Sequence, residues 1–259
     1  MDAKEVVEAI GKGVVAALRT SELMLGIEEF ASRNADIHPE YITTVRVAEA
    51  LTGPDRVVSL EALMKDLRRD AGFLARLKDL KTHAKWPAIA ATLKHPAYRF
   101  GKKRLDILVR ESSTERPPLL MVEAKLGVKN TAGILADVDR IVTLFDMYQA
   151  VGALQGHAVY GAVVFHAMQE AGTAATLPTY AGALLSSVQS HLANLRQQNS
   201  WLQFNAGLLS ATLIQQPVQG YREDHDDGTS ENVFEKDQFA FQAGMILIGT
   251  TVDVGTVQF

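Results

Sequence analysis

Two short apolar runs separated by a polar loop constrain the fold of this chain more than any other feature. Residues 104–110 read RLDILVR, residues 119–126 read LLMVEAKL, and the polar segment 111–118 between them ends in two prolines. Aliphatic and β-branched runs of this length, bounded by loop residues, are typical of β-strands. We therefore expect an antiparallel hairpin whose turn is centred between residues 114 and 115.

Three ionisable residues lie inside these apolar runs, namely Asp106, Glu123 and Lys125. Burying an unpaired charge costs several kcal/mol, so we expect these residues to be paired with other charges or to bind a ligand. A hairpin with the expected centre sets Asp106 opposite Glu123, and directly opposed residues share one face of the sheet. Lys125 is two residues beyond Glu123 and shares that face. The sequence thus predicts two carboxylates and one ammonium group that project together.

Two carboxylates this close repel each other unless a cation lies between them. The chain has no cysteine, which excludes thiolate zinc sites and Fe–S clusters. Hard oxygen ligands favour Mg²⁺, with Mn²⁺ as a substitute. Such a metal polarises a phosphoryl oxygen and lowers the pKa of a bound water, while Lys125 orients the attacking water and offsets transition-state charge. A structural salt bridge to Lys125 is the alternative interpretation.

The pattern of Asp106, sixteen residues, and then Glu123-Ala124-Lys125 resembles the PD-(D/E)XK nuclease superfamily, whose members have the restriction-endonuclease-like fold. The expected order of helix, three strands, helix and strand over residues 38–167 is similar to the core of that family. The resemblance implies an α/β protein: a restriction-endonuclease-like α-β-α sandwich with a central mixed sheet flanked by helices, extra N-terminal helices and C-terminal strands.

The resemblance also implies roles for individual residues. Asp106 and Glu123 would be metal ligands, the carbonyl of Ala124 a further ligand, and Lys125 the catalytic lysine. Leu105 precedes the aspartate, where many members of the family have proline.

Many members of the family add a glutamate from the helix before the strands. Glu40 is the candidate here and Glu49 is its rival; a capping role for Glu40 is the alternative, because acidic residues are favoured near helix N-termini. The helix after the motif often carries a polar residue that faces the site, and Arg140 or Asp137 fits that position. Taken without the resemblance, Asp137 and Asp139 indicate ordinary helix surface.

The net charge of −4 conceals an uneven distribution. Residues 65–104 carry twelve basic and three acidic side chains, whereas the segments on either side are acidic. A phosphate backbone favours such a block, because each neutralised phosphate releases condensed counterions; a solvated helical face is the alternative. Trp86 and Tyr98, which are interleaved with this block, either stack on bases or pack in the core. The expected nucleic-acid-binding residues are Lys94, Arg99, Lys102, Lys103, Arg104 and Arg140.

We expect residues 1–259 to form a single domain with N-terminal helices in 1–37, a catalytic core in 38–167, and a helix and strands in 168–259. Hydrophobic periodicity and turn residues delimit the elements. The expected helices are 3–18, 21–32, 39–51, 59–80, 86–93, 130–150 and 177–205. The expected strands are 98–100, 104–110, 119–126, 159–165, 213–221 and 239–250, with an acidic loop at 223–232.

Residues 141–220 contain only three charged side chains. Because interfaces are depleted in charge, we expect part of this stretch to be core and part to join subunits of a homodimer or larger homo-oligomer. The chain has neither a secretory signal nor an apolar run of membrane-spanning length, so we expect a cytoplasmic protein that does not bind membranes.

The sequence therefore predicts a Mg²⁺-dependent endodeoxyribonuclease acting on duplex DNA, and the resemblance implies a role in restriction or anti-phage defence. Two alternatives stay open. One is a catalytically idle scaffold of the same fold that binds nucleic acid or protein. The other is a nuclease directed at RNA, because no feature of the chain recognisably reads the 2′-hydroxyl.

Overall fold

The computed structural model describes residues 1–31, 39–78, 85–112, 115–128, 130–169, 177–209, 214–217, 221–224, 230–233 and 238–259. Its helices are α1 (Ala3–Ala31), α2 (Pro39–Ala50), α3 (Met64–Lys78), α4 (Trp86–Leu93), α5 (Ala132–Ala150) and α6 (Leu177–Gln198). Its strands are β1 (Arg56–Leu63), β2 (Arg104–Glu111), β3 (Leu120–Val128), β4 (Tyr160–Gln169), β5 (Gln203–Leu208), β6 (Ile214–Pro217), β7 (Tyr221–Asp224), β8 (Ser230–Val233) and β9 (Gln238–Gly249).

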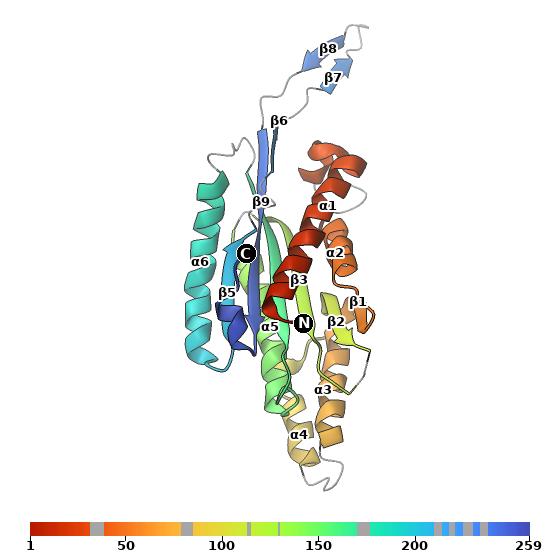
Figure 1. Ribbon diagram of the computed structural model, residues 1–259, viewed down its shortest axis with the longest axis vertical. Helices are drawn as coiled ribbons and strands as arrows, with labels where there is room; N and C mark the ends of the chain where they lie inside the picture. Colours follow the sequence, from red (N-terminus) through yellow and green to blue (C-terminus); the bar gives the residue numbers. More distant parts are fainter. Residues whose placement is uncertain are drawn as a thin grey trace.

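A mixed sheet runs through the molecule in the strand order β1-β2-β3-β4-β9-β5, and β6 pairs with the first part of β9. Strands β3 and β4 are parallel, and the other pairs of this sheet are antiparallel. The C-terminal strands β9 and β5 therefore continue the sheet built by residues 38–167. Strands β7 and β8 form a separate hairpin, which extends away from the body of the protein (Figure 1).

Helices cover both faces of the sheet, as Figure 1 shows. Helices α1 and α2 bury apolar side chains against one face, and α3, α5 and α6 bury theirs against the other. The first contact includes Ile10, Val14, Val47, Val122 and Val164. The second includes Leu67, Val138, Val188, Met121 and Val163. This arrangement confirms the mixed α/β class and explains why β3 and β4, which are covered on both sides, are almost continuously apolar.

The hairpin of β2 and β3 has the register that the sequence predicts. Ile107 pairs with Val122, Leu108 with Met121 and Val109 with Leu120. One step further along the same register sets Asp106 opposite Glu123. The next connection is also the predicted one: α5 crosses from β3 to the parallel strand β4, as parallel neighbours require.

The side chain of Asn130 caps the N-terminal end of α5. The carboxamide oxygen Oδ1 of Asn130 accepts a hydrogen bond from the N–H of Ala132 at 3.0 Å, whereas Thr131 makes no capping hydrogen bond with its side chain. An unsatisfied amide at the helix start is thereby paired. This contact starts α5 directly after β3, close to the charged residues of that strand.

The first strand of the sheet is not where the sequence predicts it. Residues 98–100 do not form a strand, because a 3₁₀ helix occupies Pro96–Tyr98. The strand is β1, whose residues 59–63 were expected to be helical. The spacing of Leu60 and Leu63 imitates a helix, and β1 is an edge strand whose partner β2 begins about forty residues later. Pairing over that distance overrides the local pattern.

Three more regions differ from expectation. Helix α1 is continuous, so a new helix does not begin at Ser21; the hydroxyl of Thr20 bonds to the carbonyl oxygen of Ala16 at 2.9 Å, within the helix. Helix α6 ends at Gln198, and the expected helical residues 203–205 belong to β5. In the described part of the chain, strand β5 pairs only with β9, almost forty residues away. The residues next to β5 in the sequence therefore do not indicate that it is a strand. Strands β7 and β8 take up both ends of the expected acidic loop 223–232.

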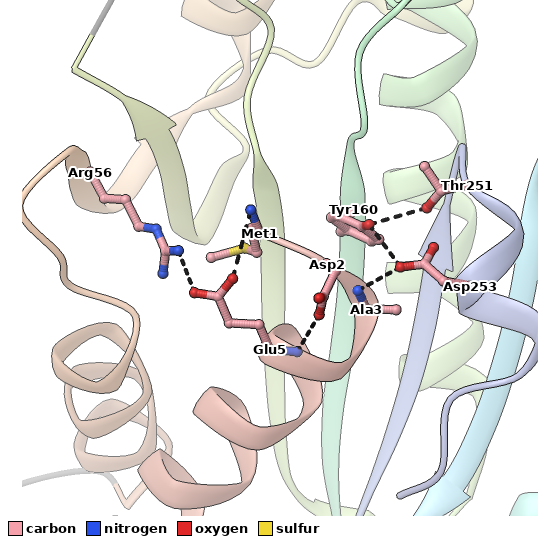
Figure 2. Close-up of polar contacts among 8 residues, drawn as sticks. All are labelled: Met1, Asp2, Ala3, Glu5, Arg56, Tyr160, Thr251 and Asp253. Carbon is pink, nitrogen blue, oxygen red and sulfur yellow. Dashed lines mark hydrogen bonds and ion pairs between the residues drawn. The ribbon is translucent and has the colours of Figure 1, made fainter.

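The start of α1 is fixed to the sheet from two sides (Figure 2). The carboxylate of Asp253 accepts the N–H of Ala3 at 2.8 Å and the hydroxyl of Tyr160 at 3.2 Å. On the other side, Glu5 forms an ion pair with Arg56 of β1. Because an acid at a helix N-terminus satisfies free N–H groups, these contacts stabilise α1 where it meets the sheet.

The low charge of residues 141–220 has a simple structural basis. Strand β4 is core, and α6 buries Ala181, Val188 and Leu192. The exposed positions of α6 hold mainly uncharged polar residues such as Ser186, Gln189, Ser190, Asn194 and Gln197. The expected subunit interface is therefore not needed to explain this composition, and it stays a prediction.

Helices α1 and α2 cross closely at Gly13, which allows a direct test of their packing. A Cβ atom at Gly13 would lie 2.5 Å from the Cα of Val47, whereas one at Gly11 would meet no atom within 4 Å. We expect Gly13→Ala to lower the free energy of unfolding by roughly 1–3 kcal/mol through overpacking. The matched control Gly11→Ala should raise it by up to about 1 kcal/mol through helix propensity. Urea unfolding measures both, and equal effects would contradict this packing.

Candidate metal centre

Charged side chains from both helical layers and from the sheet meet near the C-terminal end of β3. Strand β2 contributes Asp106, and β3 contributes Glu123 and Lys125. Helix α5 contributes Asp137 and Arg140, and Glu40 reaches Lys125 from the start of α2. We call these six side chains the charged cluster. The structure thus brings together all four predicted catalytic side chains.

Asp106 occupies a position where the pairing of β2 is interrupted on both sides. Leu105 and Ile107 pair with β1, but Asp106 does not, and the pairing with β3 stops at Ile107. Opposite the gap, Glu61 of β1 has a φ of 54°, a conformation that is uncommon outside glycine. Irregularities of this kind re-aim side chains next to functional sites. Asp106 is consequently only half-buried.

The side chain of Asp106 replaces the missing contact between the two strands. Its Oδ2 atom accepts the N–H of Ala124 at 2.7 Å. In an extended strand the N–H and C=O of one residue point to the same side, so the carbonyl of Ala124 also faces Asp106. A carboxylate and a main-chain carbonyl therefore lie on the same side of β3.

Glu123 is buried, with 1% of its surface exposed. Its Oε1 atom accepts a hydrogen bond from Nη1 of Arg140 at 2.6 Å. Burial is the largest cause that raises the pKa of Glu123, to about 8; the neighbouring carboxylates of Asp106 and Asp137 also raise it, and Arg140 opposes them. In the absence of a further cation, the Glu123 carboxyl therefore holds a proton at neutral pH.

Asp137 is buried to the same extent, so the interpretation of Asp137 as ordinary helix surface is wrong. Its Oδ1 atom lies 2.9 Å from Nη2 of Arg140, and its Oδ2 atom lies 3.6 Å from Nζ of Lys125. Burial raises the pKa of Asp137, although Lys125 and Arg140 act against this. Asp139 does lie on the exposed side of α5, where it pairs with His191. The two aspartates point apart because residues two apart on a helix do not share a face.

Lys125 lies between two carboxylates. Its Nζ atom is 3.8 Å from Oε1 of Glu40 and 3.6 Å from Oδ2 of Asp137. Burial alone lowers the pKa of Lys125, but Asp137 and Glu40 outweigh it and raise the pKa above the ordinary value. A third of the side chain is exposed. Lys125 is thus a charged ammonium group within reach of a solvent-borne ligand.

The two glutamates of α2 differ in their surroundings. Glu40 lies in the first turn of α2 and contacts Lys125. Glu49 lies near the other end of the helix, is 57% exposed, and pairs with Arg46 at 2.7 Å. Of the two candidates left open by the sequence, only Glu40 is part of the charged cluster.

The expected nucleic-acid-binding residues fall into two groups. Arg140 lies inside the charged cluster, where Glu123 and Asp137 hold it. Arg104 is exposed and lies 3.9 Å from Glu61. The remaining residues of the set are exposed, namely Lys94, Arg99, Lys102 and Lys103. Residues 102–104 lead directly into β2 and end two positions before Asp106.

The donor set can be tested against the metal that the resemblance implies. Within the described ranges, no group of three or more His, Cys, Asp or Glu side chains is arranged to hold a metal ion. Mg²⁺ commonly needs only one or two carboxylates, because waters and substrate phosphates complete its shell. Asp106, Glu123 and the carbonyl of Ala124 supply oxygen donors of that kind. The residues present therefore fit Mg²⁺.

Comparisons of the chain with protein-family models, with curated proteins and with solved structures found no match. None of the helices in the described part of the chain is both long enough and apolar enough to cross a membrane.

The raised pKa of Glu123 makes the stability of the metal-free protein dependent on pH. The carboxyl of Glu123 loses its proton near pH 4.5 in the unfolded chain and near pH 8 in the folded protein. Between these values the folded state binds more protons, so stability falls as pH rises. We expect Glu123→Gln to flatten this decline by up to about 1.4 kcal/mol per pH unit.

Urea unfolding in EDTA at pH 5, 6, 7 and 8 measures this decline for both proteins. Glu49→Gln is the control, because Glu49 is exposed and its substitution should leave the pH dependence unchanged. Parallel curves for wild type and Glu123→Gln would show that Glu123 titrates normally.

Proposed function

We propose that the protein is a Mg²⁺-dependent nuclease of restriction-endonuclease-like fold that hydrolyses phosphodiester bonds of DNA. The observation that carries the proposal is the convergence of Asp106, Glu123 and Lys125 in the predicted register. The elements around them support it. Helix α2, the antiparallel strands β1 to β3, helix α5 and the parallel strand β4 follow the order on which the resemblance rests, with α3 and α4 inserted between β1 and β2.

Asp106, Glu123 and the carbonyl of Ala124 would hold the metal. When bound, Mg²⁺ polarises a phosphoryl oxygen and lowers the pKa of a coordinated water. Asp106 is partly exposed and already aligned beside Ala124 by their hydrogen bond. Glu123 is held in place by Arg140, so its second oxygen is the one available to a ligand.

Lys125 orients the attacking water and offsets negative charge that develops on the phosphoryl group. Its ammonium group stays protonated because Asp137 and Glu40 flank it. Glu40 positions this ammonium group and adds negative charge near the metal. Arg140 offsets the charge of the buried carboxylates between turnovers.

The exposed cations of residues 102–104 provide the approach for the substrate. They precede Asp106 directly and therefore bring a phosphate backbone toward the charged cluster. We propose duplex DNA as the substrate, a homodimer or larger homo-oligomer as the active form, and restriction or anti-phage defence as the biological role.

A second candidate function follows from Arg140. Its guanidinium is bound to Glu123 at 2.6 Å and to Asp137 at 2.9 Å, so two carboxylates of the cluster are already paired without a metal ion. That observation favours a nucleic-acid-binding scaffold without catalytic activity. The two functions differ in one result, because a scaffold shows no turnover that depends on Mg²⁺ or Mn²⁺.

Substitution of the three core residues tests the proposed chemistry. We expect Asp106→Ala, Glu123→Ala and Lys125→Ala each to reduce cleavage at least about a hundredfold, because metal binding or water activation is lost. Binding of DNA in EDTA should change little. The assay incubates wild type and variants with supercoiled plasmid, linear duplex, single-stranded DNA and RNA, each with Mg²⁺, Mn²⁺ or EDTA.

Each variant needs an independent check of folding by circular dichroism and thermal unfolding. Full cleavage by the folded Glu123→Ala protein with Mg²⁺ would contradict the proposal. Cleavage of RNA but not of DNA would favour the RNA-directed nuclease instead.

The two glutamates of α2 give a matched pair of variants. We expect Glu40→Gln to lower the cleavage rate, because it removes one of the two carboxylates that contact Lys125. Glu49→Gln, on the same helix but paired with Arg46, should cleave at the wild-type rate. Initial rates on supercoiled plasmid measure the difference. A larger loss for Glu49→Gln would mean that Glu40 has only a capping role.

A further inference from the structure

Helices α3 and α4 form a basic groove outside the charged cluster. The groove has a volume of about 460 Å³. That volume is typical of small-ligand sites and suits a nucleotide unit better than a base-paired duplex. Its main lining side chains are Arg68, Arg69, Phe73, Arg76, Trp86 and Lys94. We call this feature the α3–α4 groove.

The charge of the groove selects an anionic ligand. Among the residues that the structure describes, four cationic side chains line it and no acidic side chain does. Arg69 has an ion pair with Asp66, but that pair is exposed and therefore contributes little to stability. No ion pair in the described part of the chain joins these cations to the opposite helix, although the guanidinium of Arg76 contacts the ring of Trp86 on α4. The four cations are available for phosphate groups, which arginine binds through its planar fork of donors.

Aromatic rings lie between these cations. Phe73 is 48% exposed, so part of its ring is open to a ligand in the groove. Trp86 is half-buried, and the guanidinium of Arg76 lies 5.2 Å from the centre of its ring. Helix α4 is almost entirely apolar, yet none of its residues is fully buried. Cations alternating with available aromatic faces are characteristic of sites that bind unpaired nucleotides.

We propose that the α3–α4 groove binds an unpaired segment of nucleic acid, with a base stacked on Phe73 and the flanking phosphates on the arginines and Lys94. As a site that recruits duplex substrates carrying a single-stranded end or gap, it rests on the proposed function. The binding itself requires neither metal nor hydrolysis, so the two proposals can fail separately.

The position of the groove agrees with recruitment. The N–H of Met64, at the start of α3, bonds to the carbonyl oxygen of Lys103 at 3.1 Å, three residues before Asp106. Arg69 and Arg76 follow Met64 by five and twelve residues. At 1.5 Å per residue they lie roughly 8–18 Å from Met64 along the helix. Helix α3 also packs on the same face of the sheet as α5.

Fluorescence anisotropy in EDTA tests the groove with the full-length protein. The probes are single-stranded DNA, a blunt duplex and a duplex with a single-stranded overhang. We expect Phe73→Ala to weaken binding of the single strand and of the overhang by roughly 5- to 100-fold, with at most a twofold change for the blunt duplex. Phe73→Tyr keeps the ring and should bind like wild type.

The charge of the groove is tested by salt dependence. Removing one phosphate contact should reduce the slope of log affinity against log salt by about 0.7 for a single strand, and we expect Arg76→Glu to reduce it by at least that amount. Lys4→Glu is the control, because Lys4 is an exposed cation on α1, away from the groove. Its slope should equal that of wild type.

Three results would overturn the proposal: wild-type binding of single strands by both Phe73→Ala and Arg76→Glu, an equal loss for the blunt duplex in Phe73→Ala, or the same slope change in Lys4→Glu. Thermal unfolding of each variant verifies that it is folded. Cleavage by Asp106→Ala reports on the nuclease proposal alone.

Discussion

The centre of this structure depends on Arg140, which contacts two buried carboxylates at once. Its guanidinium binds Glu123 on β3 and Asp137 one turn earlier on α5. Removing one partner of a buried, hydrogen-bonded charge leaves the others uncompensated, which typically costs 3–5 kcal/mol. Lys125 extends the compensation to Glu40 on the opposite layer. The sheet and one helix from each layer are therefore joined by charge at this place, in addition to the apolar packing between them.

The contact of Arg140 with the two carboxylates also affects the proposed metal chemistry. With Arg140 in place, the carboxylates tolerate burial without a metal ion, and the raised pKa of Glu123 shows that the compensation is incomplete. In the proposed metal centre, a divalent cation held by Asp106 and Glu123 would supply further positive charge. Arg140 is then a positioning residue that keeps Glu123 oriented toward the metal. A contact between Arg140 and nucleic acid stays a prediction.

The sequence allowed the core of the cluster to be predicted, because its geometry is local. The β2–β3 hairpin follows from two apolar runs and one loop, and its register sets Asp106 beside Glu123. The sequence also indicates Arg140 and Asp137 as candidates on the next helix. It does not indicate that these two side chains bind each other. Spacing along a helix shows which residues share a face, and not which element covers that face.

The elements that were missed depend on distant partners. Strand β1 carries a leucine spacing typical of a helix and becomes a strand through its pairing with β2. Strand β5 requires β9, which lies about forty residues further along the chain. The gap at Asp106 also escaped prediction, because it arises from the positive φ of Glu61 on β1. Tertiary pairing decides such features, and local propensity does not report it.

The central claim is that the charged cluster is a metal centre, and a crystal structure with Mn²⁺ tests it most directly. Anomalous scattering locates Mn²⁺ independently of the surrounding protein. If the charged cluster is a metal centre, we expect one Mn²⁺ ion about 2.0–2.2 Å from oxygens of Asp106 and Glu123. The carbonyl of Ala124 should complete part of its coordination shell. The absence of anomalous signal at saturating Mn²⁺, with the contact between Arg140 and Glu123 unchanged, would contradict it.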